Sequence, residues 1–149
     1  MTLQVRFSTA EEQFFFLLTN ASSNLQKIVE KALRTSELSI AEYTMLRIIE
    51  NTPGITAGEA RKRLYATAPS IAQIIAQLEP RGLLRRVDDS DDGRRLPIFI
   101  TAKGKKHLKK AKNSIAQLVR TLNLKRGHLE TLSANLSLFL STPLFHGAK

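Results

Sequence analysis

Three helix-start signals of one kind fix where helices can begin in the first half of the chain. Each has the Ser/Thr-x-x-Glu spacing of a capping box, in which a hydroxyl and a carboxylate satisfy backbone N–H groups that a helix N-terminus leaves without partners. The three pairs are Thr9 and Glu12, Ser39 and Glu42, and Thr56 and Glu59. The spacing predicts three helices within this half.

The apolar residues that follow these signals recur every three or four positions, as they do on one face of a helix. The first helix is expected to run from Thr9 for about 25 residues, or roughly 37 Å, which is more than a small domain can cover. The second must end before Pro53-Gly54, and the third is expected to end near Leu64. The far end of the first helix therefore needs something else to cover it.

A fourth helix is predicted after a tight turn at 65–68. Pro69 suits the first turn of a helix. The apolar stripe that marks its buried side consists of Ile71, Ile74, Ile75 and Leu78. Pro80 removes a backbone donor and disfavours helical geometry at Glu79, so this helix is expected to end early.

Two β segments follow, at 83–87 and 96–100. The stretch between them, 88–95, contains acids, Ser and Gly and is typical of a hairpin turn. Two short helices joined by a turn make a helix-turn-helix, and a hairpin after it makes a winged helix. The predicted fold class is mainly α with a small β-hairpin wing.

A long two-faced helix is predicted beyond Thr101, because at 100° per residue its lysines fall in one half circle and its apolar residues cluster on the other side. A final segment, 129–140, repeats the apolar pattern. The terminal helices thus have more apolar surface than so small a domain can bury, and a two-fold partner is the commonest solution. The lysines of the long helix are Lys105, Lys106, Lys109, Lys110 and Lys112, and its apolar residues are Leu108, Ala111, Ile115, Leu118, Val119 and Leu122.

The charge of the chain is strongly positive and regional. The 149 residues include 23 Lys and Arg against 13 Asp and Glu, which gives a formal net charge of +10. Residues 38–104 contribute only +2, whereas 105–126 contribute +8 and contain no acid. Such an excess favours an anionic partner, most often nucleic acid.

Several classes of chemistry are disfavoured. With no Cys there is no disulfide, thiolate nucleophile or thiol redox sensor, and His107, His128 and His146 lack the spacing of a metal site. No metal or cofactor is expected, and no acid pair, activated nucleophile or phosphate loop indicates an enzyme. The longest apolar run, 14–18, is too short to cross a bilayer, and acids stand in 1–13 where a secretory signal would be apolar. A cytoplasmic protein without a membrane partner is expected.

A series of short fragments between Leu38 and Gly104 occurs in the order and at the distances of a known family. The fragments are LSIAEY at 38–43, LRII at 46–49, PGIT at 53–56, PSI at 69–71, LE at 78–79, GLL at 82–84, DDGRR at 91–95 and TAKG at 101–104. Together they resemble the MarR family of bacterial and archaeal transcriptional regulators. The Asp/Arg-rich wing followed by the Thr-x-x-Gly helix start is the most specific part.

The resemblance implies a homodimer that binds a pseudo-palindromic operator in double-stranded DNA as a ligand-responsive repressor. It divides the chain into an N-terminal dimerisation helix at 1–37, a winged helix-turn-helix DNA-binding domain at 38–104 and C-terminal dimerisation helices at 105–149. A rival function is an architectural protein that binds DNA by charge alone, for which the lysine-rich helix would matter most.

The second helix of the motif supplies the candidate base contacts, since the start of such a helix reaches base edges in the major groove. With the isoleucine stripe turned inward, its outward positions are Ser70, Gln73 and Gln77, with Thr67 at the start. Gln can pair with adenine, and Ser or Thr can contact bases or phosphates. On the residues alone, polar side chains that merely keep an exposed helix soluble are an equal alternative.

Other basic residues are candidates for further DNA contacts. The family motif implies that one of Arg94 and Arg95 enters the minor groove while the other pairs with a wing aspartate; the alternative is a solvated turn with balanced charges. Lys62 and Lys103 are candidates for phosphate contacts.

A small aromatic effector is a further implication of the resemblance, because MarR-like proteins often bind such compounds between the dimer helices and the winged helix. Tyr43 and His107 are the candidate lining of that cleft, and ordinary core packing is the alternative for both.

Overall fold

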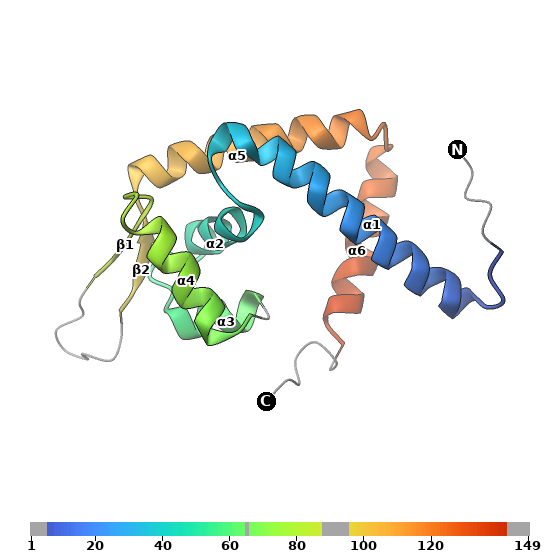
Figure 1. Cartoon of the computed structure of the whole chain (residues 1–149), viewed down its shortest axis with the longest axis horizontal. Coiled ribbons are helices and arrows are strands. Elements are labelled where there is room, and N and C mark those ends of the chain that lie inside the picture. The colour runs from blue at the N-terminus through green and yellow to red at the C-terminus, as the bar shows by residue number, and fades with distance from the viewer. Residues whose placement is uncertain (1–5, 65, 88–95, 143–149) are drawn as a thin grey trace.

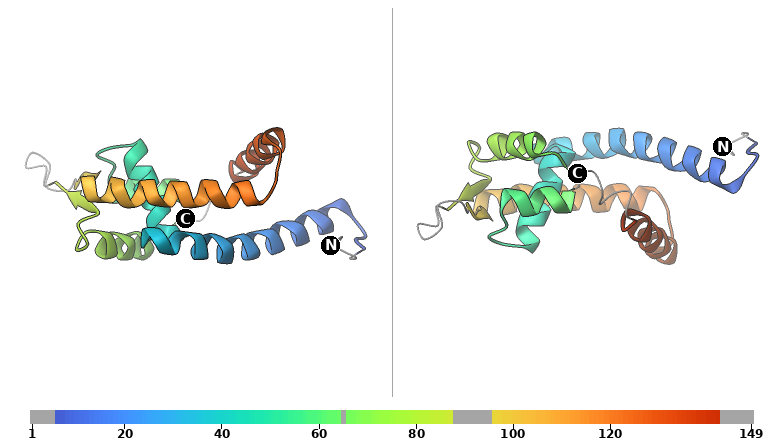
Figure 2. Two further views of the ribbon diagram at one scale, coloured as in Figure 1. Left: turned by 90° about the horizontal axis from the view of Figure 1, so that it is seen from above. Right: turned by 90° about the horizontal axis from the view of Figure 1, so that it is seen from below.

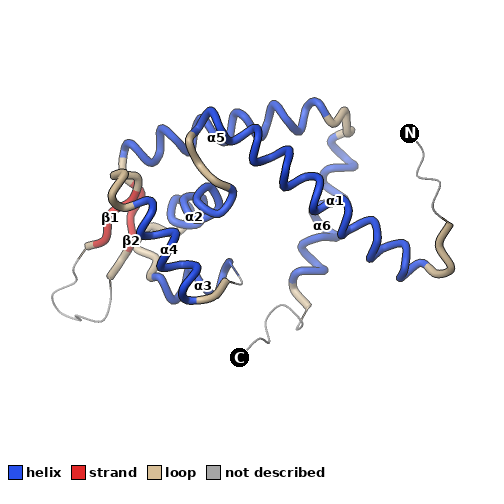
Figure 3. The backbone as a smooth tube through the Cα atoms, viewed as in Figure 1, coloured by secondary structure: helices blue, strands red, loops and turns tan. Residues whose placement is uncertain are grey.

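The computed structural model describes residues 6–64, 66–87 and 96–142, and most of these are helical (Figure 1 and Figure 3). In chain order the elements are α1 Ala10–Leu33, the 3-10 helix η1 Arg34–Ser36, α2 Ile40–Asn51, α3 Ala57–Leu64, α4 Ala68–Leu78, β1 Leu84–Arg86, β2 Ile98–Ile100, α5 Ala102–Thr121 and α6 Arg126–Leu140.

The winged helix occupies one end of the molecule, where α2, α3 and α4 gather beside the β1–β2 hairpin (Figure 1). The two strands are antiparallel, with Leu84 opposite Ile100 and Arg86 opposite Ile98. Ile55, just before α3, forms an isolated bridge with Ile98. The mainly helical fold with a hairpin wing is thereby confirmed.

One apolar core joins α2, α4 and the hairpin. From α4 it takes Ile71, Ile75 and Leu78, the predicted stripe, while Ile74 is half-buried at the edge of that stripe. A fully buried aliphatic side chain of this size contributes about 1.5–3 kcal/mol. The other buried side chains of this end include Met45, Leu46, Ile49, Leu83, Leu84 and Ile98.

Two long helices, α1 and α5, lie side by side and run in opposite directions (Figure 2). The winged helix lies at the end of this pair where α1 finishes and α5 starts. Beyond the other end of α5, α6 turns away, and an edge-to-face contact between Phe14 and Phe139, with ring centroids 5.5 Å apart, joins it to α1. The domain division at 37 and 104 stays a prediction; α5 itself begins at Ala102.

The helix starts follow the predicted caps with one difference. At Ser39 the box is complete, since Ser39 Oγ accepts from Glu42 N at 3.2 Å and Glu42 Oε2 accepts from Ser39 N at 2.8 Å; the box that starts α3 is complete as well. At Thr9 only the hydroxyl half forms, because Glu12 Oε2 accepts instead from Ser8 N, one residue further back, at 2.8 Å.

Pro80 has half of its expected effect. α4 ends at Leu78, as predicted, but Glu79 keeps helical geometry with φ −64° and ψ −48°, so the expected departure at Glu79 was wrong. The chain reverses two residues after the proline, at Gly82, whose φ of +67° is in the region that favours glycine and whose N–H bonds to Glu79 O at 2.9 Å.

Gly104 lets α5 lie directly against the base of the hairpin. It is buried in the first turn of α5, and the hydroxyl of Thr101 accepts its N–H at 3.0 Å. A Cβ at this position would overlap the carbonyl oxygen of Leu83 and would lie 2.8 Å from Ile100 Cγ1. The Thr-x-x-Gly motif therefore combines a helix cap with a close approach of two backbones.

Gly104→Ala is expected to lower the free energy of unfolding by about 1–3 kcal/mol, because the overlap with backbone cannot be relieved by a side-chain rotation. Gly58→Ala is the matched control: Gly58 lies in α3, and a Cβ there meets nothing within 4 Å. That variant should be neutral or gain up to about 1 kcal/mol of helix propensity. Urea unfolding at one protein concentration measures both, and equal midpoints would contradict the close approach.

Candidate nucleic-acid interface

The outer side of α4 is polar or small throughout, because the inner side is taken by the isoleucine stripe. The four predicted contact residues, from the N-cap Thr67 to Gln77, therefore lie together along the exposed side of this one helix. The exposed residues of this stretch are Thr67, Ala68, Pro69, Ser70, Ala72, Gln73, Ala76 and Gln77.

Thr67 and Ser70 serve the start of α4 itself. Thr67 Oγ1 accepts the backbone N–H of Ser70 at 3.4 Å, and the two hydroxyls are 2.8 Å apart. Gln73 and Gln77 follow on the exposed side, and each amide has both a donor and an acceptor at its tip. The outer side of α4 thus offers directional hydrogen bonding at a position that the Thr67 cap fixes.

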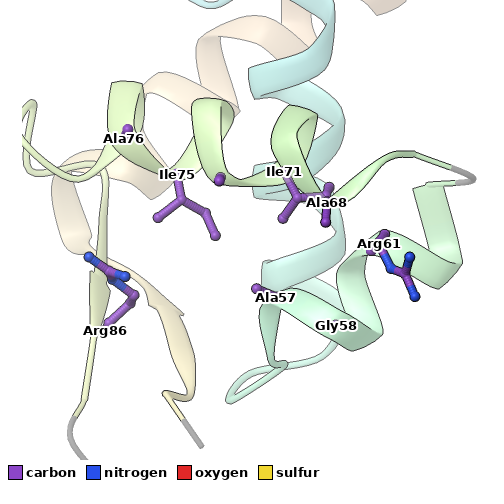
Figure 4. A pocket seen from close by; sticks show the side chains of 9 residues that line it. Ala57, Gly58, Arg61, Ala68, Ile71, Ile75, Ala76 and Arg86 are labelled. Atoms are coloured by element: carbon purple, nitrogen blue, oxygen red, sulfur yellow. The ribbon is translucent and has the colours of Figure 1, made fainter. Parts of the chain in front are cut away.

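A hollow of about 350 Å³ runs beside α4, between α3 and β1 (Figure 4). Ile71 and Ile75 point into it from α4, and Arg61 and Arg86 lie on opposite sides of it. The rest of the lining is small: Ala57, Gly58, Ala68, Ala72 and Ala76.

Arg86 joins β1 to the end of α4 by a two-point ion pair. Its Nε donates to Glu79 Oε1 at 3.0 Å and its Nη2 to Glu79 Oε2 at 2.5 Å. The hydrogen bond from Arg86 holds the pKa of the Glu79 carboxyl below its ordinary value, and the same bond raises the pKa of Arg86. The planar fork fixes direction as well as distance, so α4 and the wing are oriented relative to each other.

A second ionic group holds the turn between α4 and β1. The carboxylate of Glu42 is buried, and its two oxygens accept hydrogen bonds from different partners. Oε2 completes the cap at Ser39, and Oε1 accepts from Arg81 Nη1 at 2.7 Å. Arg81 also donates to the carbonyl of Glu37, and its own carbonyl accepts from Lys103 Nζ at 2.8 Å. The ammonium of Lys103, a predicted phosphate contact, therefore has a partner within the protein.

The remaining predicted DNA contacts are spread over other parts of the chain. Lys62 is exposed on α3, the helix that forms one wall of the hollow. Arg94 and Arg95 lie outside the described residues. The structure thus brings four of the eight predicted DNA contacts together along α4, and it places Lys62 and Lys103 on two other helices.

The two residues predicted to line an effector cleft lie on α2 and α5, away from the outer side of α4. Tyr43 is half-buried on α2 and packs against the core, which is the alternative considered for it. His107, on α5, has 16% of its side chain exposed, and its Nδ1 lies 2.9 Å from the carbonyl oxygen of Ser36.

Within the described ranges no three His, Asp or Glu residues are grouped to hold a metal ion. No helix in those ranges combines the length and apolar character needed to span a bilayer.

Sequence reasoning missed Arg81 and Arg86. Their carboxylate partners are Glu42, 39 positions away, and Glu79, 7 positions away. Both pairs cross a chain reversal, so no helical or strand periodicity reveals them. For Glu79 and Arg86 the sequence signal was the Gly82 turn between them, which does not indicate which residues pair; Glu42 and Arg81 both precede that turn and had no such signal.

Comparison with known proteins places this arrangement in a family. Residues 36–95 match the MarR family. The HTH-type transcriptional repressor Rv2887 of Mycobacterium tuberculosis is 28% identical over 96 residues, which cover 64% of this chain and 69% of that protein. The transcriptional regulator HosA of Escherichia coli is 35% identical over 72 residues, or 48% of this chain and 53% of HosA.

The fold extends the likeness to the terminal helices. The transcriptional repressor CouR, solved bound to a 23-mer DNA duplex, superposes with a TM-score of 0.81 at 22% identity, covering 91% of this chain and 98% of that one. Rv2887, solved in complex with salicylic acid, superposes with a TM-score of 0.65 at 25% identity, covering 83% and 93% of the two chains.

Fold and site together define a winged helix-turn-helix protein with long terminal helices. The match over 36–95, the relatives and the shared fold confirm the predicted resemblance to the MarR family of transcriptional regulators. The relatives named above are transcriptional regulators rather than enzymes.

Arg86→Gln is expected to raise the pKa of Glu79 toward its ordinary value of 4.5, because the carboxylate loses the hydrogen bond that stabilises it. In the parent protein the folded-state pKa is below the unfolded one, so the pair stabilises the fold above the unfolded pKa and this contribution is lost as pH falls through the folded pKa. NMR titration of the Glu79 carboxyl carbon measures the change.

Arg85→Gln is the control for this titration, because Arg85 lies over the ring of Phe99, 5.1 Å from its centroid, and makes no hydrogen bond to Glu79. The Glu79 pKa should be unchanged in that variant. If Arg86→Gln also leaves the pKa unchanged, Arg86 is not the group that orients the end of α4.

Proposed function

We propose that this protein is a homodimeric transcriptional repressor that binds a pseudo-palindromic operator and places one α4 in the major groove of each half-site. One observation carries the proposal: α4 has a fully apolar buried side and an exposed side on which Gln73 and Gln77 follow its capped start. The repressor Rv2887, which matches this chain over 96 residues, supports it.

Base recognition by α4 rests on the chemistry of its outer side. The major groove of B-DNA admits a helix, and a glutamine amide can pair with N6 and N7 of adenine. The small side chains of Ala72 and Ala76 let a base edge or sugar approach the flank of the helix closely. Arg61, across the hollow, and the exposed Lys62 then supply cations for the phosphates beside that groove.

Dimerisation rests on the apolar surface of the terminal helices. Of the large apolar side chains that are exposed within the described ranges, all but Leu96 lie on α1, on α6 or in the segment that joins α5 to α6. Phe15 and Leu138 are more than 70% exposed. A second copy covers such a surface with the same surface of its own, and a two-fold axis also gives two α4 helices. To enter two half-sites of an operator they must lie about one turn of DNA apart, roughly 34 Å.

An effector is the regulatory part of the proposal. Rv2887 has been solved with salicylic acid. In this chain a hollow of about 380 Å³ between α1 and α5 combines the apolar Ile28 and Leu118 with the ammonium-bearing Lys31, which suits an aromatic carboxylate. Tyr43 and His107 remain the predicted lining of the cleft between the dimer helices and the winged helix. Either ligand position would regulate only by favouring one of two conformations.

Selection of bound duplexes from a random pool, followed by titration of the selected and random duplexes at several salt concentrations, tests the DNA-binding proposal. A sequence-specific regulator prefers the selected duplex by about a thousandfold or more, and the preference persists at each salt concentration. Equal affinities with a steep common salt dependence would establish the rival function, an architectural protein that binds by charge alone.

Gln73→Ala is expected to change which base is selected at one position of each half-site and to cost about 1–3 kcal/mol of discrimination there, because the amide is proposed to pair with that base. Gln26→Ala makes the same change on the exposed face of α1 and should leave the selected sequence as it is. Repeating the selection with each variant shows which DNA sequence it prefers. If the two variants select the same sequence, Gln73 does not contact a base.

The double variant Leu132→Glu/Leu136→Glu is expected to be monomeric, because two carboxylates would have to be buried in the proposed α6 interface. Both leucines are exposed in the single chain, at 50% and 44%, so the fold of the subunit should survive. Ala134→Glu/Ser137→Glu adds the same two charges on the opposite side of α6, where Glu130 lies. Sedimentation equilibrium distinguishes them, and equal masses for both variants would exclude this face of α6 from the interface.

A further inference from the structure

α5 is one of the two terminal helices that contact the winged helix, the other being α1. Its first turn is fixed to the hairpin at Gly104, its middle packs on α2, and its last turns extend beyond the winged helix toward α6 (Figure 2). The angle between α5 and α2 therefore decides where the winged helix lies relative to the rest of the molecule.

A polar contact on one flank of α5 fixes it to the end of α2. Lys112 Nζ lies 2.6 Å from Glu50 Oε2, and Arg47 Nη1, one turn earlier on α2, lies 2.8 Å from the same oxygen. The hydrogen bond from Lys112 is the largest cause of a lowered pKa for Glu50, so this carboxylate is ionised at neutral pH. Lys112 is the member of this group that comes from another helix.

The opposite flank of α5 is fixed to the segment before α2. His107 Nδ1 lies 2.9 Å from the Ser36 carbonyl oxygen, and Ser114 Oγ lies 3.1 Å from Thr35 Oγ1. At 100° per residue, Lys112 is about 140° round the helix from His107, so the contacts fall on two sides of the axis. α5 is thus held from both flanks, at η1 and at the last turn of α2.

Between these flanks the contact is apolar. Leu108 and Ala111, on the side of α5 that faces the core, are fully buried. Apolar burial is non-directional, so it holds α5 against the core without opposing a small roll of the helix about its axis. An ion pair at 2.6 Å does oppose that roll, because the distance between Nζ and Oε2 changes as soon as the helix turns.

We propose that the Glu50–Lys112 ion pair is a positioning contact that sets the separation of the two α4 helices in the dimer, and with it the half-site spacing that the protein accepts. The inference rests on the proposed function, since it requires a dimer and an operator with two half-sites. Glu50 and Lys112 touch no DNA in this arrangement and act through the orientation of α5.

Distance measurement between spin labels tests the proposal without DNA. The chain has no Cys, so Gln73→Cys gives a single label on α4 of each subunit. In this background Lys112→Gln and Glu50→Gln should each broaden the intersubunit distance distribution, and the double variant should broaden it no further, because both changes remove the same contact.

Two controls separate the contact from charge and from local effects. Lys110→Gln removes the same charge from the exposed lysine face of the same helix. Arg47→Gln removes the partner that Glu50 has within α2 and leaves its link to α5. Both should retain the parent distribution. A Lys112→Gln distribution as narrow as that of Lys110→Gln would overturn the proposal, whereas a parent protein without any intersubunit signal would overturn the dimer itself.

Operator duplexes whose half-sites are moved apart or together by one or two base pairs provide the functional readout. Lys112→Gln should bind the preferred spacing about threefold to tenfold more weakly than Lys110→Gln and should discriminate less among spacings, because a half-exposed ion pair contributes little binding energy of its own and acts by restricting orientation. Binding to a duplex with one half-site should be equal for the two variants. If one half-site is bound more weakly as well, Lys112 acts on α4 or on DNA directly and the positioning role is wrong.

Discussion

Burial of one side of α4 is the constraint on which the whole candidate interface depends. Ile71, Ile75 and Leu78 are at most 5% exposed, and turning the helix by one residue would bring this apolar area into water. At about 25 cal/mol per Å² of apolar area, that would cost several kcal/mol, far more than any hydrogen bond on the outer side could recover. The outward direction of Gln73 is therefore decided by the core and not by its own contacts.

Ionic contacts between elements add direction to this packing. The Glu79–Arg86 fork connects the end of α4 to the wing, and the buried carboxylate of Glu42 connects the following turn to α2 through Arg81. The half-exposed Glu79–Arg86 pair contributes little to the free energy of unfolding, but its geometry is specific. The apolar core holds α4 in place, and the ion pairs determine how the helix and the hairpin lie relative to each other.

The sequence predicts those parts of the structure that depend on interactions between residues close together in the chain. Capping at Ser39 or Thr67 involves residues three apart, and the isoleucine stripe has the period of a helix, so helix starts and the outer side of α4 could be found. The Thr9 cap shows the limit of this reasoning, because whether Glu12 bonds to residue 9 or to residue 8 depends on the chain before the helix. Glu42–Arg81 and Glu50–Lys112 join positions 39 and 62 apart, and only the assembled fold brings these residues together.

The winged helix and the terminal helices differ in how much of their apolar surface is buried within the chain. The winged helix forms one buried core together with Leu33 of α1 and with Leu108 and Ala111 of α5. The described ranges leave no buried side-chain polar atom without a partner. In the single chain the terminal helices leave large apolar side chains such as Phe15 and Leu138 exposed to water. The proposed dimerisation involves the terminal helices alone, and the junction of α5 with α2 helps to set where the winged helix lies. Apolar packing is tolerant of small rolls, so the contacts of Lys112 and His107 are the part of that junction able to specify one placement.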